Sequence, residues 1–185
     1  MNLPRADLLQ LAPELDVAAW LNTPQPISLQ SLRGQVVLLH AFQMLCPACV
    51  SHGLPQASAA HERFGAHGLA VLGLHTVFEH HAAMGAEALA AFVHEYRLRF
   101  PIAIDRPAGD GPVPLTMRRY GFRGTPSLAL IDHRGQLRMS HFGRVDDLAL
   151  GAAIGRLLEE RDRADADACT PEGCALPAGI DGARA

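Results

Sequence analysis

Two apolar runs in the first half of the chain predict strands that are buried on both faces. Residues 36–42 and 69–75 are almost entirely hydrophobic and lack the alternation of polar and apolar positions that a half-exposed strand shows. Each run is followed by an alanine-rich segment with helical character, residues 47–64 after the first and 86–99 after the second. This part of the chain is therefore predicted to form two consecutive strand–helix units.

The second half predicts a short strand, a short helix, a hairpin and a final helix. The strand candidate at 100–105 contains Pro101, which has no N–H for a sheet ladder and restricts the segment to an edge or a strand beginning. A turn at His133-Arg134-Gly135 separates two further strands, and Asp146 precedes the last helix. The remaining elements are expected at residues 115–120, 127–132 and 136–142. The pattern predicts an α/β fold, a sandwich in which helices flank a central mixed β-sheet.

The length of 185 residues indicates one domain with extensions. We expect the domain at residues 18–162 and an N-terminal extension at residues 1–17. After residue 163 the sequence turns to Ala, Asp, Gly and Pro, which predicts a flexible C-terminal tail at residues 163–185.

Composition and charge argue against a nucleic acid or a membrane as a partner. Hydrophobic residues make up 49 % of the chain and charged residues 19 %, and the net charge of −3 provides no positive field for a nucleic acid. The longest uncharged apolar runs are far shorter than the roughly 18 residues that span a bilayer. We therefore expect no membrane-spanning segment.

The first residues of the chain do not resemble an export signal. Arg5, Asp7, Glu14 and Asp16 are scattered through them, without a basic start, a clean apolar stretch and a small-residue cleavage site. We therefore expect a cytoplasmic protein. In that compartment cysteines are more often catalytic or metal-binding than structural.

The four cysteines fall into two close pairs, of which the first suggests redox chemistry. Cys46-Pro47-Ala48-Cys49 stands where the first buried strand ends and a helix begins. Unpaired N–H groups and the helix dipole favour the thiolate of Cys46, which is the expected nucleophile. Cys49, one turn further, is the expected resolving thiol that attacks a mixed disulfide on Cys46. Pro47 suits the first helical turn because it has no N–H to satisfy.

Two other roles of this pair stay open, a metal site and an inert pair of core thiols. A zinc site would need further ligands, and although His52 is near, no second Cys-x-x-Cys and no His-x₃-His accompanies the motif. A carrier that binds copper or zinc through Cys46, Cys49 and a histidine is the non-enzymatic alternative. The redox function itself requires no metal and no other cofactor.

Short motifs spread over residues 18–160 point to a family. They are Trp20-Leu21-Asn22-Thr23, Leu29 to Leu38, Cys46 to Cys49, Gly73-Leu74-His75-Thr76 and Gly121 to Ser127. Together they resemble the TlpA/ResA-like branch of the thioredoxin superfamily, which is related to the AhpC/TSA redoxins, and most of all the thioredoxin-like domains of the DipZ type. The resemblance implies a thioredoxin-like three-layer sandwich with an inserted βα unit. It also implies a thiol–disulfide oxidoreductase with antioxidant activity, whose partners are protein disulfides or dithiols and an upstream thiol reductant.

The resemblance further implies a substrate-binding loop. Thr125-Pro126 matches the family's cis-proline loop, which lies against the active-site sulfurs and offers backbone groups to an extended substrate. Pro47 and Ala48, between the cysteines, are expected to contact the same substrate. An ordinary trans proline at the start of a strand is the alternative, since most X–Pro bonds in folded proteins are trans.

The chain departs from the family pattern at three places. Gln43-Met44-Leu45 replace the usual aromatic-rich approach to the cysteines, which bears on the choice of partner. Pro55 follows Cys49 one residue later than the helix proline of the family. No buried acid is evident as a proton acceptor for Cys49. Glu79, after the second strand, is the accessory candidate, although a solvated loop glutamate is the more common situation.

A peroxiredoxin-like thiol peroxidase is the runner-up enzyme, because the fold and the position of the cysteine are shared. Its signature resembles Pro-x₃-Thr-x₂-Cys. Aligned on Cys46, it puts Leu39 and Gln43 at the proline and threonine positions, and aligned on Cys49 it puts Phe42 and Cys46 there. We therefore expect disulfide exchange and little peroxide turnover.

The second pair, Cys169 and Cys174, brackets Thr170-Pro171-Glu172-Gly173 in the predicted tail. A segment with Pro and Gly can turn tightly enough to close its own disulfide. One interpretation is a tethered second dithiol that exchanges with Cys46. The other is a pair of exposed thiols without a partner, or a weak metal clip.

Overall fold

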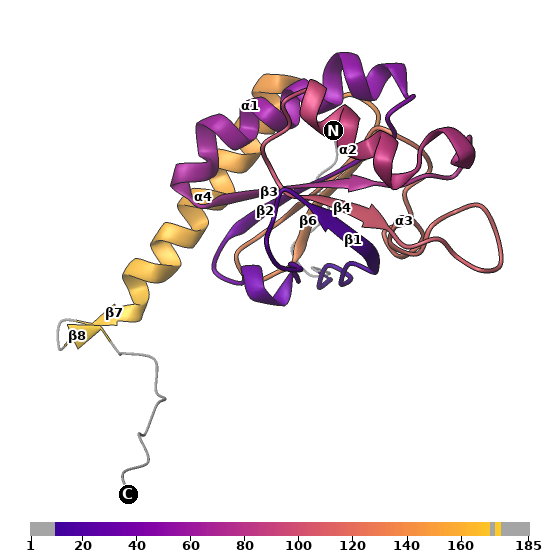
Figure 1. Ribbon diagram of the computed structural model, residues 1–185. Helices are drawn as coiled ribbons and strands as arrows, with labels where there is room; N and C mark the ends of the chain where they lie inside the picture. The colour runs from indigo at the N-terminus through magenta and orange to yellow at the C-terminus, as the bar shows by residue number, and fades with distance from the viewer. Residues whose placement is uncertain (1–9, 171–172, 175–185) are drawn as a thin grey trace, which may run out of the picture.

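The centre of the molecule is a mixed sheet of six strands in the order β1-β4-β3-β2-β5-β6 (Figure 1). The computed structural model describes residues 10–170 and 173–174. β2, β3 and β4 run parallel to one another, whereas β1, β5 and β6 join their neighbours in antiparallel fashion. The strands span Val17–Leu21 (β1), Val36–Phe42 (β2), Leu69–His75 (β3), Ile102–Asp105 (β4), Ser127–Ile131 (β5) and Leu137–Phe142 (β6).

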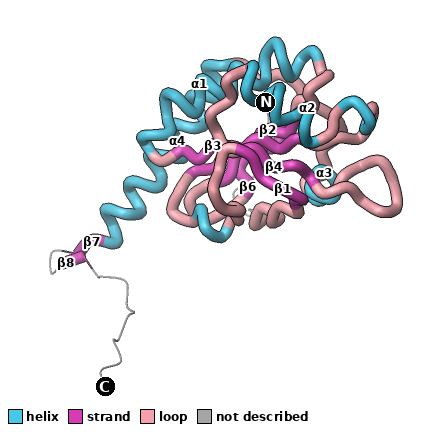
Figure 2. Tube along the Cα trace, viewed as in Figure 1, coloured by secondary structure: helices cyan, strands magenta, loops and turns pink. Residues whose placement is uncertain are grey.

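Helices cover both faces of the sheet and complete three layers (Figure 2). α1, α2 and α4 contribute to one core, where their apolar side chains meet Phe42 and Phe100. α3 and the N-terminal segment contribute to the other core, around Leu39 and Leu74. The helices span Leu54–Phe64 (α1), Ala86–Glu95 (α2), Leu115–Arg119 (α3) and Asp147–Ala168 (α4). The fold class predicted from the sequence, a thioredoxin-like sandwich around a mixed sheet, is confirmed.

β2 and β3 form the buried centre of the sheet, at the bounds of the two apolar runs. All residues of β2 are buried, and all but one of β3. The two strands pair from Val36 opposite Leu69 to Phe42 opposite His75. Their alternate side chains point to opposite faces and supply both cores. Because parallel strands end at the same edge of a sheet, the segment that follows Phe42 lies at the carboxyl edge of β2 and β3.

β1 was not predicted from the sequence. It pairs antiparallel with β4 and is only partly buried. The segment before it, which the sequence analysis assigned to an extension, also lies against the domain: Leu11 forms a bridge with Gln136, and Ala12 is buried. A half-exposed edge strand of five residues has too weak a hydrophobic pattern to be recognised by periodicity.

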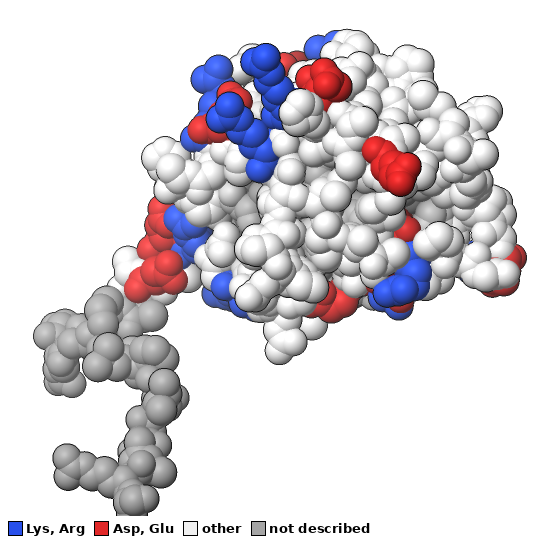
Figure 3. Space-filling model, in the orientation of Figure 1, with Lys and Arg blue, Asp and Glu red and all other residues white. Residues whose placement is uncertain are grey.

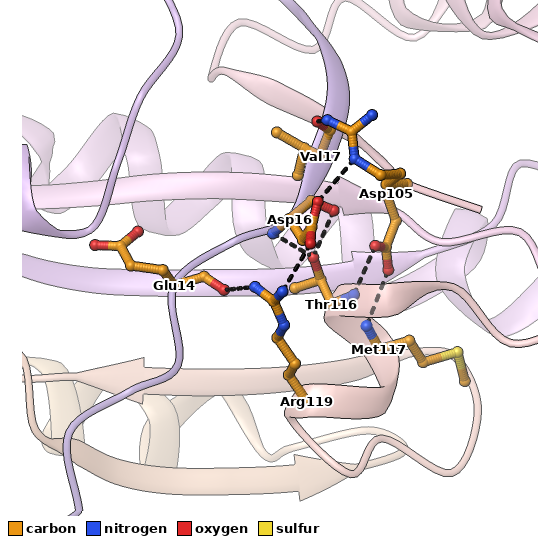
Figure 4. Close-up of polar contacts among 8 residues, drawn as sticks. Glu14, Asp16, Val17, Asp105, Thr116, Met117 and Arg119 are labelled. Carbon is orange, nitrogen blue, oxygen red and sulfur yellow. Dashed lines mark hydrogen bonds and ion pairs between the residues drawn. The ribbon is translucent and has the colours of Figure 1, made fainter. Parts of the chain in front are cut away.

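A polar cluster fastens this N-terminal segment to β4 and α3 (Figure 4). Asp16 accepts hydrogen bonds from Arg106 and Arg119, each at 2.7 Å. The buried carboxylate of Asp105, at the end of β4, accepts from the backbone N–H of Thr116 at 2.8 Å and from that of the next residue at 3.0 Å. These bonds satisfy free N–H groups at the start of α3. Burial nevertheless raises the pKa of Asp105 above its usual value.

α4 is longer than the sequence analysis predicted. It continues to Ala168, beyond residue 163, where a flexible tail was expected to begin. Its last turns are rich in alanine, and Arg163 forms an ion pair with Glu159 one turn earlier, both of which favour a helix. α4 runs out past the sheet and ends in a short hairpin of β7 (Cys169–Thr170) and β8 (Gly173–Cys174) (Figure 1). Residues 1–9, 171–172 and 175–185 lie outside the described part of the chain.

Charged side chains are unevenly spread over the surface. Figure 3 shows arginines gathered over α1 and the adjoining part of α4, mixed with acidic side chains, beside a broad area without charge. Within the described residues, no helix combines the length and the apolar character needed to cross a membrane.

Candidate active site

The Cys-x-x-Cys motif lies directly after β2. The chain reverses in a tight turn, in which the N–H of Cys46 donates to the carbonyl of Gln43 at 3.2 Å, and then enters a helix. Cys46 is partly exposed, whereas Cys49 is fully buried. Pro47 and Ala48 between them are exposed. The motif therefore presents one sulfur and two small apolar residues to solvent and buries the second sulfur.

The two sulfur atoms lie 2.6 Å apart and are free thiols. The backbone N–H of Cys49 donates to Sγ of Cys46 at 3.2 Å. This N–H is one of the unpaired donors at a helix N-terminus, where the dipole also favours negative charge. On its other side, Sγ of Cys46 lies 3.5 Å from the carbonyl oxygen of Thr125. The arrangement offers Cys46 an N–H donor at a helix N-terminus while its sulfur stays accessible.

Cys49 is held as a neutral thiol. Burial, assisted by the hydrogen bond to Cys46, raises its pKa to about 12. At neutral pH the thiol therefore keeps its proton until a change of bonding at Cys46 makes its removal favourable. Because Cys49 has no exposed surface, its sulfur can reach only a group that is already attached to Cys46.

A π-helical turn joins the motif to α1. It spans Cys49–Gly53, and the N–H of Leu54 donates to the carbonyl of Cys49, five residues earlier. A π turn accommodates one residue more than an α turn. Pro55, which comes one residue later than the family pattern has it, is the second residue of α1 and follows Leu54 after this turn. The π turn thus absorbs the additional residue, so that Cys49 faces the core and α1 still packs its apolar side on the sheet.

The Thr125–Pro126 peptide bond is cis, as the resemblance implied. Its loop leads into β5, which pairs with β2, and the N–H of Gly143 donates to the carbonyl of Pro126 at 2.8 Å. Opposite the proline, a Cβ on Gly53 would lie 3.3 Å from Cβ of Pro126. The loop is therefore packed against the helix that carries the cysteines, with the Thr125 carbonyl beside Cys46.

A buried histidine that the sequence pattern did not single out lies beneath this contact. His40, in β2, is 4 % exposed, and its Nε2 has no hydrogen-bond partner among the described residues. Burial lowers the pKa of His40 to about 4, so the ring is neutral at physiological pH. The signal that could have revealed it is its place as the polar residue within the apolar run 36–42.

The sequence also suggested three accessory residues, Glu79, Cys169 and Cys174, and the structure places all three on segments other than the one that carries the two sulfurs. Glu79 is exposed in the loop after β3, as a solvated loop glutamate would be. Two carboxylates are buried elsewhere: Asp105 caps α3, and Asp132 binds backbone N–H groups of the turn before β6. Cys169 and Cys174 lie opposite each other in the backbone register of the terminal hairpin. A role of either cysteine in exchange stays a prediction.

Metal ligation was the alternative use of the two cysteines. Among the described residues, no group of three or more His, Cys, Asp or Glu side chains is arranged to hold a metal ion. His52, the histidine close to the motif in sequence, is exposed, and its Nδ1 lies 2.6 Å from Oγ of Ser51. In this conformation, Cys46 and Cys49 have no third ligand within the described part of the chain.

Comparison with known structures identifies proteins of the same architecture. A thioredoxin-like superfamily protein of known crystal structure is 54 % identical, and the match covers 80 % of this chain and 96 % of that protein, with a TM-score of 0.78. A thiol-disulfide isomerase from Corynebacterium glutamicum is 46 % identical with the same coverage and a TM-score of 0.76.

Sequence comparison assigns the family. Protein DipZ of Mycobacterium bovis is 33 % identical over 158 residues, which are 80 % of this chain and 21 % of DipZ, and DipZ of Mycobacterium tuberculosis matches equally. The chain thus spans about a fifth of the length of these relatives. Residues 9–140 match the model of the AhpC/TSA family. Together with the sheet order and the structural neighbours, this match shows that the chain belongs to the AhpC/TSA family and has the fold of the thioredoxin superfamily.

Proposed function

We propose that this protein exchanges disulfides with protein partners through Cys46-Pro47-Ala48-Cys49. The observation that carries the proposal is the asymmetry of the two sulfurs. They lie 2.6 Å apart, yet Cys46 is accessible and receives an N–H bond, whereas Cys49 is buried with a raised pKa. An exposed nucleophile with a concealed resolving thiol is the arrangement that two-step exchange requires.

In the first step, the Cys46 thiolate attacks one sulfur of a substrate disulfide. A bond forms between Cys46 and that sulfur, the substrate S–S bond breaks, and the other substrate sulfur leaves as a thiolate. The N–H of Cys49 no longer faces an anion once Cys46 is in the mixed disulfide. The charge that opposed ionisation of Cys49 is then also gone, because Cys46 has become neutral.

In the second step, Cys49 gives its proton to solvent or to the substrate thiolate released in the first step, and its sulfur attacks Sγ of Cys46. The new Cys46–Cys49 disulfide forms, the mixed disulfide breaks, and the second substrate sulfur leaves as a thiolate. The substrate has gained two electrons and the protein has lost two. A further round needs an upstream thiol reductant that returns the pair to the dithiol, so such a reductant is the second proposed partner.

The loop at Thr125–Pro126 is the proposed docking place of the substrate. The carbonyl of Thr125 lies beside Sγ of Cys46, and Pro47 and Ala48 are exposed next to it. A polypeptide in extended conformation could bind along this loop through main-chain hydrogen bonds while its disulfide meets Cys46.

The test is turnover of insulin and of a small chromogenic disulfide by the reduced protein. Cys46→Ser is expected to abolish both activities, and Cys49→Ser to stop after one turnover with the substrate covalently attached to Cys46. A Cys169→Ser/Cys174→Ser variant serves as the matched control that removes two thiols and retains the motif. Equal loss of activity in the control and in Cys46→Ser would contradict the proposal.

A thiol peroxidase is the second candidate, because the matching family model is that of AhpC/TSA proteins. The residues before the cysteine do not support a fast peroxidase. Leu39 is buried in the core on the α3 side of the sheet, and the side-chain oxygen of buried Gln43 accepts from the N–H of Phe78 at 3.4 Å. Neither position supplies a hydroxyl to hold a peroxide beside Cys46. Peroxide consumption as fast as disulfide reduction, lost in Cys46→Ser, would favour this candidate instead.

We also propose that the protein is located in the cytoplasm, where an upstream thiol reductant is present. This location is supported by cysteines that are paired at short range in the sequence. Trapping the thiols with an alkylating reagent in intact cells, followed by fractionation, tests both the location and the redox state of the Cys46/Cys49 pair.

A further inference from the structure

A groove of about 520 Å³ runs between α1 and α4, beside the helix that carries the cysteines. Its walls are largely apolar and include Pro55, Ala59 and Phe64 from α1 and Leu148, Gly151 and Ile154 from α4. Leu148 stands at the rim with 85 % of its surface exposed, which is unusual for so large an apolar side chain. The volume lies within the range of pockets that bind ligand-sized groups.

The rim of this groove is positively charged. Arg63 and Arg144 line it and are exposed, and within the described residues neither forms an ion pair. Exposed His52 lines the same rim. Asp147 is the lining carboxylate, and it accepts a hydrogen bond from the side-chain amide of Gln56. Two arginines that have no ion-pair partner in the described part of the chain stand above an apolar floor, which favours an occupant that is both apolar and acidic.

The groove lies close to the Thr125–Pro126 loop. A small cavity lined by Pro126 and Gly143 shares His52, Gln56 and Arg144 with it. Ser51, also on the groove, donates its hydroxyl to the carbonyl of Pro47 at 2.8 Å, which places the groove about one helical turn from the cysteines. Arg144 therefore lies between the Thr125–Pro126 loop and the groove, within reach of a polypeptide that is bound along the loop.

We propose that the groove between α1 and α4 is a docking site for protein substrates, in which it binds a segment with an apolar side chain flanked by carboxylates. The inference rests on the proposed disulfide exchange and adds a substrate class to it. The apolar side chain enters between Phe64 and Leu148, and its acidic neighbours pair with Arg63 and Arg144. Such a site selects substrates by sequence near the disulfide, although the sulfur chemistry itself is independent of sequence.

The test uses short peptides that carry one cysteine as a mixed disulfide with a chromogenic thiol. One peptide contains leucine flanked by glutamates, and its partner contains leucine flanked by lysines. We expect the reduced protein to prefer the acidic peptide. Arg144→Glu should lower kcat/KM for the acidic peptide by about tenfold, mainly through KM, and improve the lysine peptide. Leu148→Ser should weaken both peptides.

Two variants at the opposite end of the sheet are the matched controls. Arg134→Glu reverses the charge of an exposed side chain at the turn between β5 and β6, and Leu11→Ser replaces another exposed leucine. Both should leave the two peptides unchanged. An effect of Arg144→Glu no larger than that of Arg134→Glu, or the absence of a charge preference, would overturn the inference.

Two further outcomes would show that something other than a substrate occupies the groove, and either would overturn the inference. If a chain truncated after Ala168 bound the acidic peptide more tightly than the full chain, the groove would be covered by the protein's own C-terminal segment. If Leu148→Ser abolished self-association of the protein, the occupant would be a second copy. Turnover of a small chromogenic disulfide by the unmodified protein distinguishes failure of the proposed disulfide exchange from failure of the docking site. No turnover would refute disulfide exchange. Turnover without a preference for the acidic peptide would refute only the docking site in the groove.

Discussion

Gly53 and His40 approach each other so closely that no side chain fits between them. A Cβ on Gly53 would lie 2.5 Å from Cε1 and 2.7 Å from Nε2 of the buried His40. This contact lies between the π turn and β2, and it determines how near the helix with the cysteines comes to the sheet. The geometry of the sulfurs therefore depends on a glycine and a histidine that take no part in the exchange chemistry.

We predict that Gly53→Ala destabilises the protein because the added methyl group must displace His40 or the helix. The expected loss is about 1–3 kcal/mol in the free energy of unfolding, as for other overpacked cores. Urea unfolding followed by circular dichroism measures it. Gly155→Ala is the control, since that glycine in α4 has open space around its Cβ position and should gain up to about 1 kcal/mol. Equal effects of the two substitutions would contradict the close contact.

Alkylation of the reduced native protein should modify Cys46 well before Cys49. The reason is that Cys49 is fully buried and its pKa is raised to about 12, whereas Cys46 is accessible. Iodoacetamide labelling at neutral pH, quenched at intervals and followed by mass spectrometry, measures the order. In urea the two rates should converge, which serves as an internal control. Faster modification of Cys49 in the native protein would reverse the proposed roles.

The stability of the protein should fall as the pH drops below about 6.5. Burial lowers the pKa of His40 and of His75 to about 4, while an unfolded histidine titrates near 6.5. Between these values the unfolded chain binds more protons than the folded one, so acid favours unfolding. Each histidine should account for about 2 kcal/mol of lost stability at pH 5.

Urea unfolding at pH 7.5 and at pH 5 measures this dependence. His40→Asn should flatten it by removing one of the two groups, whatever its effect on stability at neutral pH. His94→Asn is the control, because that histidine is exposed and its removal should leave the dependence unchanged. A dependence equally steep in His40→Asn and in the unmodified protein would show that His40 does not titrate as described.

One interpretation of Cys169 and Cys174 was a relay, in which this second dithiol exchanges with Cys46, and the structure suggests a test of it. α4 has 22 residues and is therefore about 33 Å long, and its Arg161 lies against Gly68, just before β3 begins. β7 and β8 thus lie beyond the end of the sheet opposite to Cys46. We expect Cys169→Ser/Cys174→Ser to leave the reduction potential of the Cys46/Cys49 pair and the turnover of a protein disulfide unchanged.

A tryptic digest reports the two cysteine pairs separately. The chain contains no lysine, so cleavage after arginine leaves Cys46 and Cys49 together in residues 34–63 and the terminal pair in residues 164–184. Equilibration in glutathione buffers, alkylation and mass measurement then yield the redox state of each pair, because a closed disulfide is two hydrogens lighter than the dithiol. A peptide cross-linked between the two segments in single-cysteine variants would support the relay after all.

Much of the fold and the reactive pair were determined locally by the sequence. The apolar runs 36–42 and 69–75 became β2 and β3 at their predicted bounds, because a strand buried on both faces leaves an unbroken hydrophobic signal. Cys46 and Cys49 were recognisable because their spacing at a strand-to-helix junction is itself the chemical requirement. These features depend on neighbours in the sequence, which is why periodicity and spacing could reveal them.

The tertiary structure decided what depends on residues that are distant in the chain. β1 exists because it pairs with β4, and the position of the Thr125 carbonyl beside Cys46 requires β5 to lie next to β2. The difference between the two thiols arises from burial, and burial is a property of the assembled core. Neither the contact between Gly53 and His40 nor the groove beside the cysteines has a local signal, because each is formed by surfaces that only folding brings together.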